Sequence, residues 1–472
     1  MTDLPLTHRT AVELRTMLGR RDVSAREVLD AHLRRIEEVN PAVNALVTLV
    51  PELAMERAQA ADDAAARGGE LGVLHGLPVG HKDLAETKGI RTTLGSPIFA
   101  DWVPDRDALI VERQIAAGAV TVGKTNTPEF GAGSNTFNPV FGVTGNPYDL
   151  ERTCGGSSGG AAVALATRML PLCDGSDLGG SLRNPAAFCN IVGFRPSAGR
   201  VPSSTSGAAW SPMATDGPMA RTVADVALFL QAIAGPDDRA PASISERPEV
   251  FAGSLEVDLR GVRVAWAPDL GGLPIDPAIR AAMAGIPDIL SDLGCVVEEA
   301  CPDFGNAREI FQRQRAWLFE MNSGPLLDRY RDQMKETVIW NIEQGRQATM
   351  ASHVNASRMQ ADLFRRVTAF MQDYEFIACP VTQVPPFPHA QEYITEIDGV
   401  EMETYIDWMR VCSDITCTTL PAISVPAAFT PEGLPVGLQL VGRHRADRRV
   451  LELAHGWEQA TRLVDRLPAA GA

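Results

Sequence analysis

The sequence predicts an α/β fold, in which one large domain has a mixed central β-sheet covered by helices on both faces. Segments with helical periodicity alternate with short apolar segments along the 472 residues. These short segments are continuously apolar, which is typical of strands that are buried on both faces of a sheet. No internal repeat or low-complexity segment interrupts the pattern, and both ends of the chain supply pieces of one core, which favours a single domain over 1–472.

The first half of the chain has clear signals for helix starts and strands. Capping boxes at Thr10–Glu13 and Ser24–Glu27 predict two helices, the second of which ends near Asn40 and Pro41. The other elements expected here are a helix from Pro51 to Gly68, a short buried strand in Gly76–Asp83, a helix capped by Asp107 and running to Ile115, a buried strand at 119–122, a buried helix at 161–166, and a strand from Met169 to Cys173.

The second half begins with an irregular segment, because Gly193–Met219 is rich in Gly, Ser and Pro. Residues 236–248 form a second expected loop. The other elements expected are helices at 223–235, 277–293 and 450–460, strands at 262–266, 376–379, 420–425 and 436–441, and a mostly helical stretch at 309–346 that breaks at Ser323-Gly324-Pro325.

Composition limits the partners and the compartment. The formal net charge of −16 argues against nucleic acids and anionic membranes, which both need a basic face. Met1–Thr10 has no signal-peptide pattern, and no apolar run is long enough for a membrane span, so a cytoplasmic protein is expected. The eight cysteines include no C-x-x-C and no zinc-ligand spacing, which predicts buried thiols in a reducing compartment. No motif implies a metal or an organic cofactor.

Two glycine pairs, each followed by serine, lie close together in Gly155–Ser181. Gly155-Gly156 precedes Ser157 and Ser158, which would lie at the N-terminus of the helix at 161–166, where free N–H groups favour negative charge. Gly179-Gly180 precedes Ser181, and successive N–H groups at such a turn can bind an oxyanion. A serine beside such a turn is typical of acyl-transfer chemistry, which also requires a base.

Lys82 is a candidate for that base. Lysine occurs only at Lys82, Lys88, Lys124 and Lys335, and arginine supplies the remaining positive charge. A lysine on a buried strand loses proton affinity and can act as a base near neutral pH, which arginine cannot do. The alternative is a structural lysine that forms a salt bridge with Asp83 or with another acid.

A histidine-dependent site is a second interpretation. Residues 156–160 also fit G-x-S-x-G, the nucleophile elbow of α/β-hydrolases, which requires an acid and a histidine later in the chain. The later histidines are His353, His389, His444 and His455. Proximity in sequence does not establish triad geometry, so this hypothesis stays open at this point.

Several motifs together resemble the amidase signature family. Lys82, Ser157 and Ser181 occur in order, with separations of 157 − 82 = 75 and 181 − 157 = 24 residues. The resemblance covers nearly the whole chain and is weakest from about Pro236 to Tyr405. The segments that carry it are Gly76–Asp83, Gly155–Gly160, Gly175–Arg183, Pro185–Cys189, Val192–Pro196, Leu420–Pro426 and Gly433–Leu440.

The resemblance implies a Ser-cisSer-Lys triad. Ser181 would be the nucleophile, Ser157 the bridging serine after a cis peptide bond, and Lys82 the base. The N–H groups of Leu178, Gly179 and Gly180, with that of Ser181, would form the oxyanion hole. The loop Phe130–Ser134, with Gly131, Ala132 and Gly133 as the expected substrate-binding residues, corresponds to a segment that lines the acyl side of the site in relatives. Residues 60–235 would form the catalytic core segment and 300–410 a variable segment that shapes the pocket.

The resemblance therefore implies a serine-dependent amidase acting on a small, aryl or anilide carboxamide, or on a carbamate. Trp317, Phe319, Met321, Trp340 and Trp408 favour an apolar substrate, although ordinary core packing is the alternative for most of them. Other hypotheses are the amidase subunit of a glutamine-dependent tRNA amidotransferase and a non-catalytic binding protein, although the full triad disfavours the latter. A homodimer is expected, because dimers are common among relatives.

Two residues depart from the family pattern near the expected nucleophile. Asp174 stands where an apolar residue is usual, and Asn184 stands where a larger side chain often follows the arginine. Both could shape the pocket or affect the base. An Asp174 carboxylate that reached the Lys82 amine would keep it charged and weaken it as a base.

Overall fold

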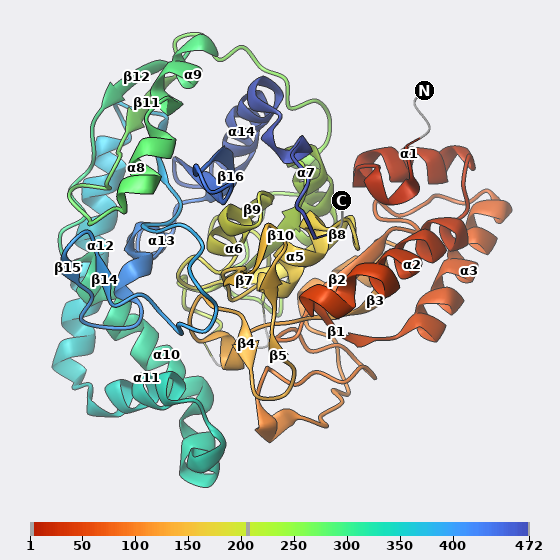
Figure 1. Ribbon diagram of the computed structural model, residues 1–472, viewed down its shortest axis with the longest axis horizontal. Coiled ribbons are helices and arrows are strands. Elements are labelled where there is room, and N and C mark those ends of the chain that lie inside the picture. Colours follow the sequence, from red (N-terminus) through yellow and green to blue (C-terminus); the bar gives the residue numbers. More distant parts are fainter. Residues whose placement is uncertain (1–3, 204–207, 471–472) are drawn as a thin grey trace.

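The computed structural model describes residues 4–203 and 208–470. Within these ranges the centre of the molecule is a mixed sheet of eleven strands flanked by helices, which confirms the predicted fold class (Figure 1). The strands are, in spatial order, β1 (Leu46–Leu49), β3 (Val120–Thr125), β2 (Pro78–Lys82), β8 (Leu172–Asp177), β10 (Thr215–Ala220), β9 (Val192–Arg195), β16 (Ala422–Phe429), β17 (Pro435–Gly442), β13 (Phe376–Pro380), β11 (Arg263–Trp266) and β12 (Val296–Glu299).

The sheet combines parallel and antiparallel pairs. β2 lies parallel to both β3 and β8, and β11 lies parallel to both β13 and β12. The pairs from β8 through β10, β9, β16 and β17 to β13 are antiparallel, as is β1 with β3. The shorter strands, which form three two-stranded sheets, are β4 (Phe137–Asn138), β5 (Gly142–Val143), β6 (Gly145–Asn146), β7 (Asp149–Thr153), β14 (Glu396–Ile397) and β15 (Val400–Glu401).

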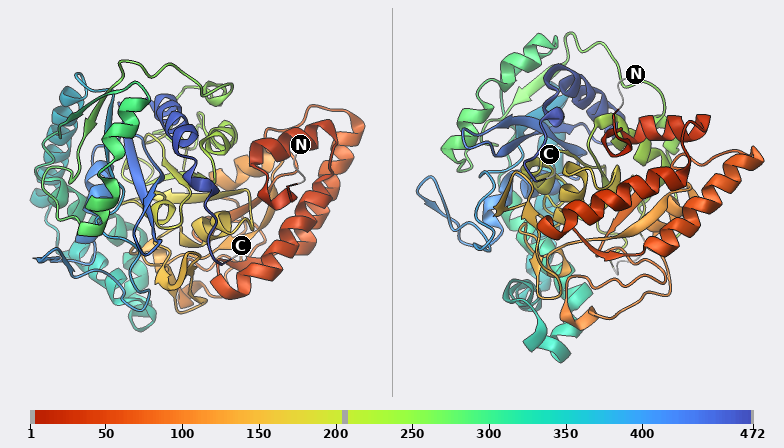
Figure 2. Two further views of the ribbon diagram at one scale, coloured as in Figure 1. Left: turned by 45° about the horizontal axis from the view of Figure 1, so that its top comes forward. Right: turned by 45° about the vertical axis from the view of Figure 1, so that its right-hand side comes forward.

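The helices form groups at both ends of the sheet and against its centre. Figures 1 and 2 show the N-terminal helices (red) at one end of the molecule and α10–α12 (cyan) at the other. The helices are α1 (Ala11–Arg20), α2 (Ala25–Val43), α3 (Pro51–Arg67), α4 (Leu109–Ala116), α5 (Gly159–Ala166), α6 (Arg183–Phe188), α7 (Val223–Ile233), α8 (Pro277–Met283), α9 (Ile286–Asp292), α10 (Ala307–Tyr330), α11 (Glu336–Gln347), α12 (Met350–Phe370), α13 (Arg410–Thr416) and α14 (Asp447–Thr461). Short 3₁₀ helices are η1 (Leu6–His8), η2 (Pro97–Phe99), η3 (Glu129–Gly131), η4 (Pro248–Phe251), η5 (Arg331–Gln333), η6 (Asp407–Met409) and η7 (Leu463–Asp465).

The predicted helix starts at the N-terminus are confirmed, with one exception. Thr10 and Ser24 both form complete capping boxes, and α3 ends at Gly68, which has φ of 75°. The predicted cap at Asp107 is wrong, because the helix begins at Leu109 and Asp107 instead accepts the backbone N–H of Lys88. Short polar side chains hydrogen-bond nearby backbone groups in loops as well as at helix ends, which explains the error.

The segment Gly193–Met219, predicted to be irregular throughout, contributes to two central strands at its ends, and only its described residues between these strands are irregular. β9 pairs with β10 and with β16, and β10 also pairs with β8. A side chain at Gly193 would lie 2.2 Å from the Leu182 carbonyl oxygen, so this strand needs glycine for close packing rather than for a turn. Residues 204–207 of the segment lie outside the described residues, as do the ends of the predicted domain at 1–3 and 471–472.

Two helix boundaries in the second half differ from the prediction. α10 continues through Pro325 to Tyr330, and the Arg346 guanidinium donates to the Gly324 carbonyl oxygen at 2.8 Å. The predicted break at Ser323-Gly324-Pro325 is therefore wrong, and the helix gives way to η5 only at Arg331. The single helix expected at 277–293 is divided into α8 and α9.

The main core joins elements from both halves of the chain. It extends from Ala11 in α1 to Trp457 in α14, and every residue of α5 is buried. All eight cysteines are among the described residues and are unpaired thiols, seven of them buried. None of the helices within 4–203 and 208–470 combines the length and the apolar character that a membrane crossing needs.

Candidate active site

Lys82 lies at the end of β2, and the residue is only 1% exposed to solvent. Its amine Nζ donates to Ser157 Oγ at 2.8 Å and to Ser176 Oγ at 3.1 Å. Asp83 turns away, and its carboxylate accepts from the Thr93 hydroxyl and backbone N–H. The structure therefore does not show a salt bridge between Lys82 and Asp83.

The surroundings of Lys82 favour a neutral amine. Burial lowers its pKa to about 7, while the negative charges of Asp177, Asp216 and Asp174 act in the opposite direction. A lysine amine with a pKa near 7 is present in substantial part as the free base at neutral pH. Lys82 can therefore accept a proton from the serine that it contacts.

Ser157 lies in a loop whose backbone is held on both sides. The peptide bond between Gly156 and Ser157 is cis, as the resemblance implied. The Ser134 hydroxyl donates to the Gly156 carbonyl at 2.7 Å, and the Thr136 hydroxyl donates to the Gly155 carbonyl at 2.7 Å. These contacts fix the Ser157 side chain, 2% exposed, beside Lys82.

Ser181 is partly exposed and lies in the turn between β8 and α6. Its carbonyl oxygen accepts the N–H of Ser158 at 3.2 Å, which joins the two serine loops. Within the described ranges no hydrogen bond is found to the Ser181 hydroxyl. The structure therefore brings Lys82 and Ser157 into direct contact and joins Ser181 to them through the backbone. Catalytic hydrogen bonds commonly tighten only when substrate is bound.

The loop before Ser181 offers free backbone donors, but not all those that the sequence suggested. The N–H of Gly180 donates to the Asp177 carboxylate at 2.8 Å and is not available to an oxyanion. In the part of the chain that the structure describes, no acceptor is found for the N–H groups of Leu178, Gly179 and Ser181. The expected oxyanion hole therefore loses Gly180, while the other donors remain available.

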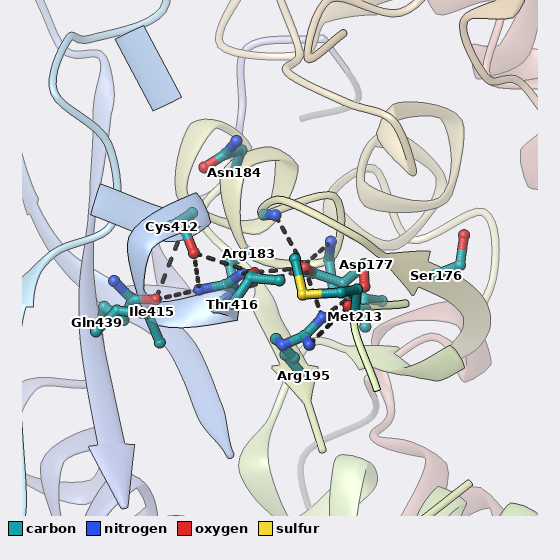
Figure 3. Close-up of polar contacts among 12 residues, drawn as sticks. Ser176, Asp177, Arg183, Asn184, Arg195, Met213, Cys412, Ile415, Thr416 and Gln439 are labelled. Atoms are coloured by element: carbon teal, nitrogen blue, oxygen red, sulfur yellow. Dashed lines mark hydrogen bonds and ion pairs between the residues drawn. The ribbon is translucent and has the colours of Figure 1, made fainter. Parts of the chain in front are cut away.

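A buried network around Asp177 holds this loop in place (Figure 3). The carboxylate accepts from Arg183 at 3.0 Å and from Arg195 at 3.2 Å, in addition to the N–H groups of Gly180 and Leu182. Burial would raise the pKa of Asp177, but the two guanidinium groups hold it well below its usual range.

The other side of Arg183 reaches the C-terminal part of the chain. Its guanidinium donates to Gln439 Oε1 on β17 at 2.6 Å and to the Thr416 hydroxyl on α13 at 2.9 Å, as Figure 3 shows. No sequence pattern marks this network, because Gln439 lies 256 residues from Arg183.

The two departures from the family pattern have separate positions. Asp174 accepts the backbone N–H of Lys82 at 2.8 Å and a hydrogen bond from His81, and it does not bond the Lys82 amine. Asn184 donates to the Ser134 hydroxyl at 3.2 Å and packs against Gly180. Asp174 thus supports the Lys82 strand, and Asn184 supports the nucleophile loop.

A cavity of about 460 Å³, lined mainly by apolar side chains with several serines among them, adjoins the site at Leu178. Phe99 and Trp102, which no sequence pattern marked, line it together with Phe130 of the expected substrate loop and Phe319 of α10. Of the five aromatic and methionine residues expected to favour an apolar substrate, Phe319 alone appears among its described lining residues. Trp408 is 1% exposed and belongs to the core.

The expected substrate loop at 130–134 contributes Phe130 to this cavity, and its Gly131 lies beside Ser157. None of Gly131, Ala132 and Gly133 is among the described residues that line the cavity. Ala132 is fully buried in a second apolar cluster with Phe319, so its side chain offers no surface to a ligand. A Cβ atom on Gly131, which has φ of +69°, would lie 3.3 Å from Ser157 Oγ.

Gly131→Ala is expected to reduce kcat/KM by about 10-fold to 100-fold, because the added methyl group displaces Ser157. Gly133→Ala is the matched control, since its φ of +97° is similarly unfavourable but its Cβ would meet nothing closer than Tyr405 at 3.8 Å. Both variants should lose similar stability in thermal unfolding, and only Gly131→Ala should lose activity. Equal losses of activity would contradict this role.

The structure does not support a histidine-dependent site. His353 packs against Trp317, His444 packs against Phe364, and His389 lies 4.0 Å from Glu151. Among the described residues, no histidine is found as a hydrogen-bond partner of Ser157 or Ser181. The group that contacts the serine is the Lys82 amine.

A mixed α/β fold that places a serine against a buried lysine defines a serine-dependent hydrolase of amide bonds. Comparison with known proteins supports this class. The family model described as Amidase matches residues 27–451, and the chain therefore belongs to the amidase family. The protein is accordingly an enzyme that hydrolyses carbon–nitrogen bonds.

Three relatives illustrate the range of the family. The chain is 35% identical to an acylamidase of Rhodococcus erythropolis, with 99% of each chain covered. It is also 35% identical to one subunit of the glutamyl-tRNA(Gln) amidotransferase of Geobacillus thermodenitrificans, with 97% of this chain and 98% of that protein covered. The crystal structure of a bacterial aryl acylamidase matches with a TM-score of 0.90 at 27% identity, covering 98% of this chain and 99% of the other.

Proposed function

We propose that the protein hydrolyses a small, uncharged carboxamide with an aryl or other apolar group, such as an anilide, through an acyl-enzyme on Ser181. The observation that carries the proposal is the 2.8 Å contact between the buried Lys82 amine and Ser157 Oγ, next to the loop that holds Ser181. A serine hydroxyl is a weak nucleophile until a base removes its proton. Lys82, with a pKa lowered to about 7, is such a base.

The proton relay runs from Ser181 through Ser157 to Lys82. Lys82 takes the Ser157 proton as Ser157 takes that of Ser181, and Ser181 Oγ forms a bond to the amide carbonyl carbon. The N–H groups of Leu178, Gly179 and Ser181 stabilise the oxyanion, each donor contributing about 3 kcal/mol. The proton returns through Ser157 to the leaving amine as the C–N bond breaks. Water then hydrolyses the ester by the same route.

The charge of the cavity supports an uncharged substrate. Glu86 is the one ionisable side chain among the described lining residues, and its carboxylate accepts from Arg106. Residues 204–207, which lie outside the described ranges, are Ser, Thr, Ser and Gly in the sequence and carry no charge. The similarity to an acylamidase and to an aryl acylamidase points in the same direction.

The second candidate is the amidase subunit of a tRNA amidotransferase, which the similarity to a subunit of such an enzyme favours. It would act on glutamine, whose carboxylate needs a cation that the described cavity lining does not provide. Purified alone, the enzyme should prefer acetanilide to 4-acetamidobenzoate by about 10³-fold in kcat/KM, because an unpaired carboxylate in an apolar cavity costs roughly 4 kcal/mol or more. Glutamine hydrolysis that exceeds anilide hydrolysis would favour the amidotransferase reading.

The proposal also covers the domain organisation of the chain, its partners and its cellular compartment. Residues 60–235 would contribute the reacting groups, and 300–410 would shape the pocket within one domain, since Leu318, Phe319 and Asn322 of α10 line the cavity. The acidic charge of −16 supports a small-molecule substrate rather than a nucleic acid. Eight unpaired thiols support a reducing cytoplasm.

A further inference from the structure

Asp174 and His81 form a fully buried pair directly behind Lys82. Asp174 is 1% exposed and His81 is 0% exposed. His81 Nδ1 lies 2.6 Å from Asp174 Oδ2, which also accepts from the Gln114 side chain at 2.8 Å. The other carboxylate oxygen, Oδ1, accepts the backbone N–H of Lys82 at 2.8 Å. One side chain therefore connects His81 to the residue proposed as the base.

The Asp174 side chain replaces a missing part of the sheet. The parallel ladder between β2 and β8 ends where Gly80 faces Cys173, so the N–H of Lys82 has no backbone acceptor on β8. Asp174 Oδ1 supplies that acceptor. Beyond this point the strands separate, and the Lys82 side chain crosses the gap to Ser176 and Ser157.

His81 is itself held from the opposite side. Its Nε2 lies 3.1 Å from the Thr121 hydroxyl, to which Arg57 Nη1 donates at 2.8 Å. Because an ionised carboxylate can only accept, Nδ1 of His81 carries the proton that it shares with Asp174. The ring orientation is thus fixed by both nitrogens, as in other buried His–carboxylate pairs.

The charges around Lys82 come from two neighbouring strands. Asp174 and Asp177 belong to β8 and Asp216 belongs to β10, and all three raise the pKa of the Lys82 amine against the effect of burial. Burial would raise the pKa of Asp174, but His81, Gln114 and the Lys82 N–H outweigh it and keep the carboxyl ionised. Lys124 on β3 and Asp216 also lie within electrostatic range of Asp174.

We propose that the His81–Asp174 pair positions Lys82: Asp174 holds the Lys82 backbone N–H where β8 offers no backbone acceptor, and it places a buried negative charge beside the strand that carries the amine. His81 orients the carboxylate through its Nδ1–H. This inference rests on the proposed function of Lys82 as the base. It gives a role to the residue that departs from the family pattern, and it makes Asp174 a positioning residue that acts through Lys82.

The test exploits the four lysines of the chain. Protein labelled with ¹³C at lysine Cε gives four signals, and the Lys82→Met variant identifies that of Lys82. The Lys82 signal of the wild type should titrate near pH 7. In Asp174→Asn the midpoint should fall by about half a unit or more, since the variant removes a nearby negative charge but retains an acceptor for the N–H.

Asp225→Asn is the matched control. Asp225 is also fully buried and accepts a backbone N–H, that of Val12, but it contacts no residue of the site. Its replacement should leave the Lys82 midpoint unchanged. The acid limb of kcat/KM should follow the NMR midpoint in each variant. Asp174→Ala, which also removes the acceptor, should lower kcat about 100-fold with little change in KM, while Asp174→Asn retains most of the activity.

The titration distinguishes failure of the proposed base from failure of the proposed role of the His81–Asp174 pair. A wild-type Lys82 that titrates at the usual pH of a lysine overturns the proposed base itself. A midpoint near 7 that is the same in wild type and Asp174→Asn overturns only the role of the pair. If Asp174→Asn does not fold, the double variant His81→Val with Asp174→Val removes both partners at once and must also lower the Lys82 midpoint, because a buried pair is replaced more safely together than singly.

Discussion

Ser181→Ala is expected to lower kcat/KM on an anilide by about 10⁴-fold or more, because it removes the hydroxyl that is proposed to form the acyl-enzyme. A fluorophosphonate probe should add once to the wild type, as seen by intact-protein mass spectrometry, and should not add to Ser181→Ala. In Lys82→Ala the same adduct should form slowly, because the Ser157–Lys82 contact that removes the proton is lost.

The control for this experiment is Ser158→Ala. Ser158 lies at the N-cap of α5 beside Ser157, and the one hydrogen bond found for its hydroxyl among the described residues is to the Ser176 carbonyl, at 3.5 Å. This variant should keep the adduct and most of the activity. An adduct that survives in Ser181→Ala would move the nucleophile to Ser157 or Ser158 and disprove the assignment.

Asp177→Ala should have the largest effect on stability. Removing this carboxylate leaves Arg183 and Arg195 buried without their shared counter-ion, which costs about 3–5 kcal/mol of unfolding free energy. Activity should also fall, because the N–H of Gly180 loses its acceptor and the nucleophile loop is released. Chemical denaturation of the wild type and the variant measures the first effect.

A surface pair gives the comparison that this prediction needs. Asp258 and Arg260 are joined at 2.6 Å, but both side chains are exposed, so Asp258→Ala should leave the denaturation midpoint almost unchanged. If Asp177→Ala had the same unfolding free energy as Asp258→Ala, the buried network around Asp177 would not be stabilising the loop that carries Ser181.

The sequence predicted those parts of the fold and site that depend on local signals. Capping boxes define the starts of α1 and α2 regardless of what packs against them. Likewise, the apolar residues before Lys82 predict a buried strand and therefore a desolvated amine. The triad positions came from motif resemblance, and the structure shows the Lys82–Ser157 part of it as a direct contact.

The parts that the sequence did not reveal depend on partners that are distant along the chain. β9 and β10 contain glycines that local rules assign to loops, although Gly217 is needed because the Phe194 carbonyl lies 2.5 Å from where its Cβ would be. The Asp177–Arg183 network ends on Thr416 and Gln439, whose roles no local pattern marks. Likewise, the sequence did not reveal that the N–H of Gly180, expected to bind an oxyanion, already donates to the Asp177 carboxylate.

The bonds from Arg183 to α13 and β17 have a consequence for synthesis of the chain. Thr416 and Gln439 leave the ribosome more than 200 residues after Arg183, and until then this guanidinium has neither acceptor. Domains generally fold as units during synthesis, so the turn that carries Ser181 reaches its final geometry only when translation is nearly complete. A nascent or C-terminally truncated chain would hold Lys82, Ser157 and Ser181, the residues of the proposed triad, and still be inactive.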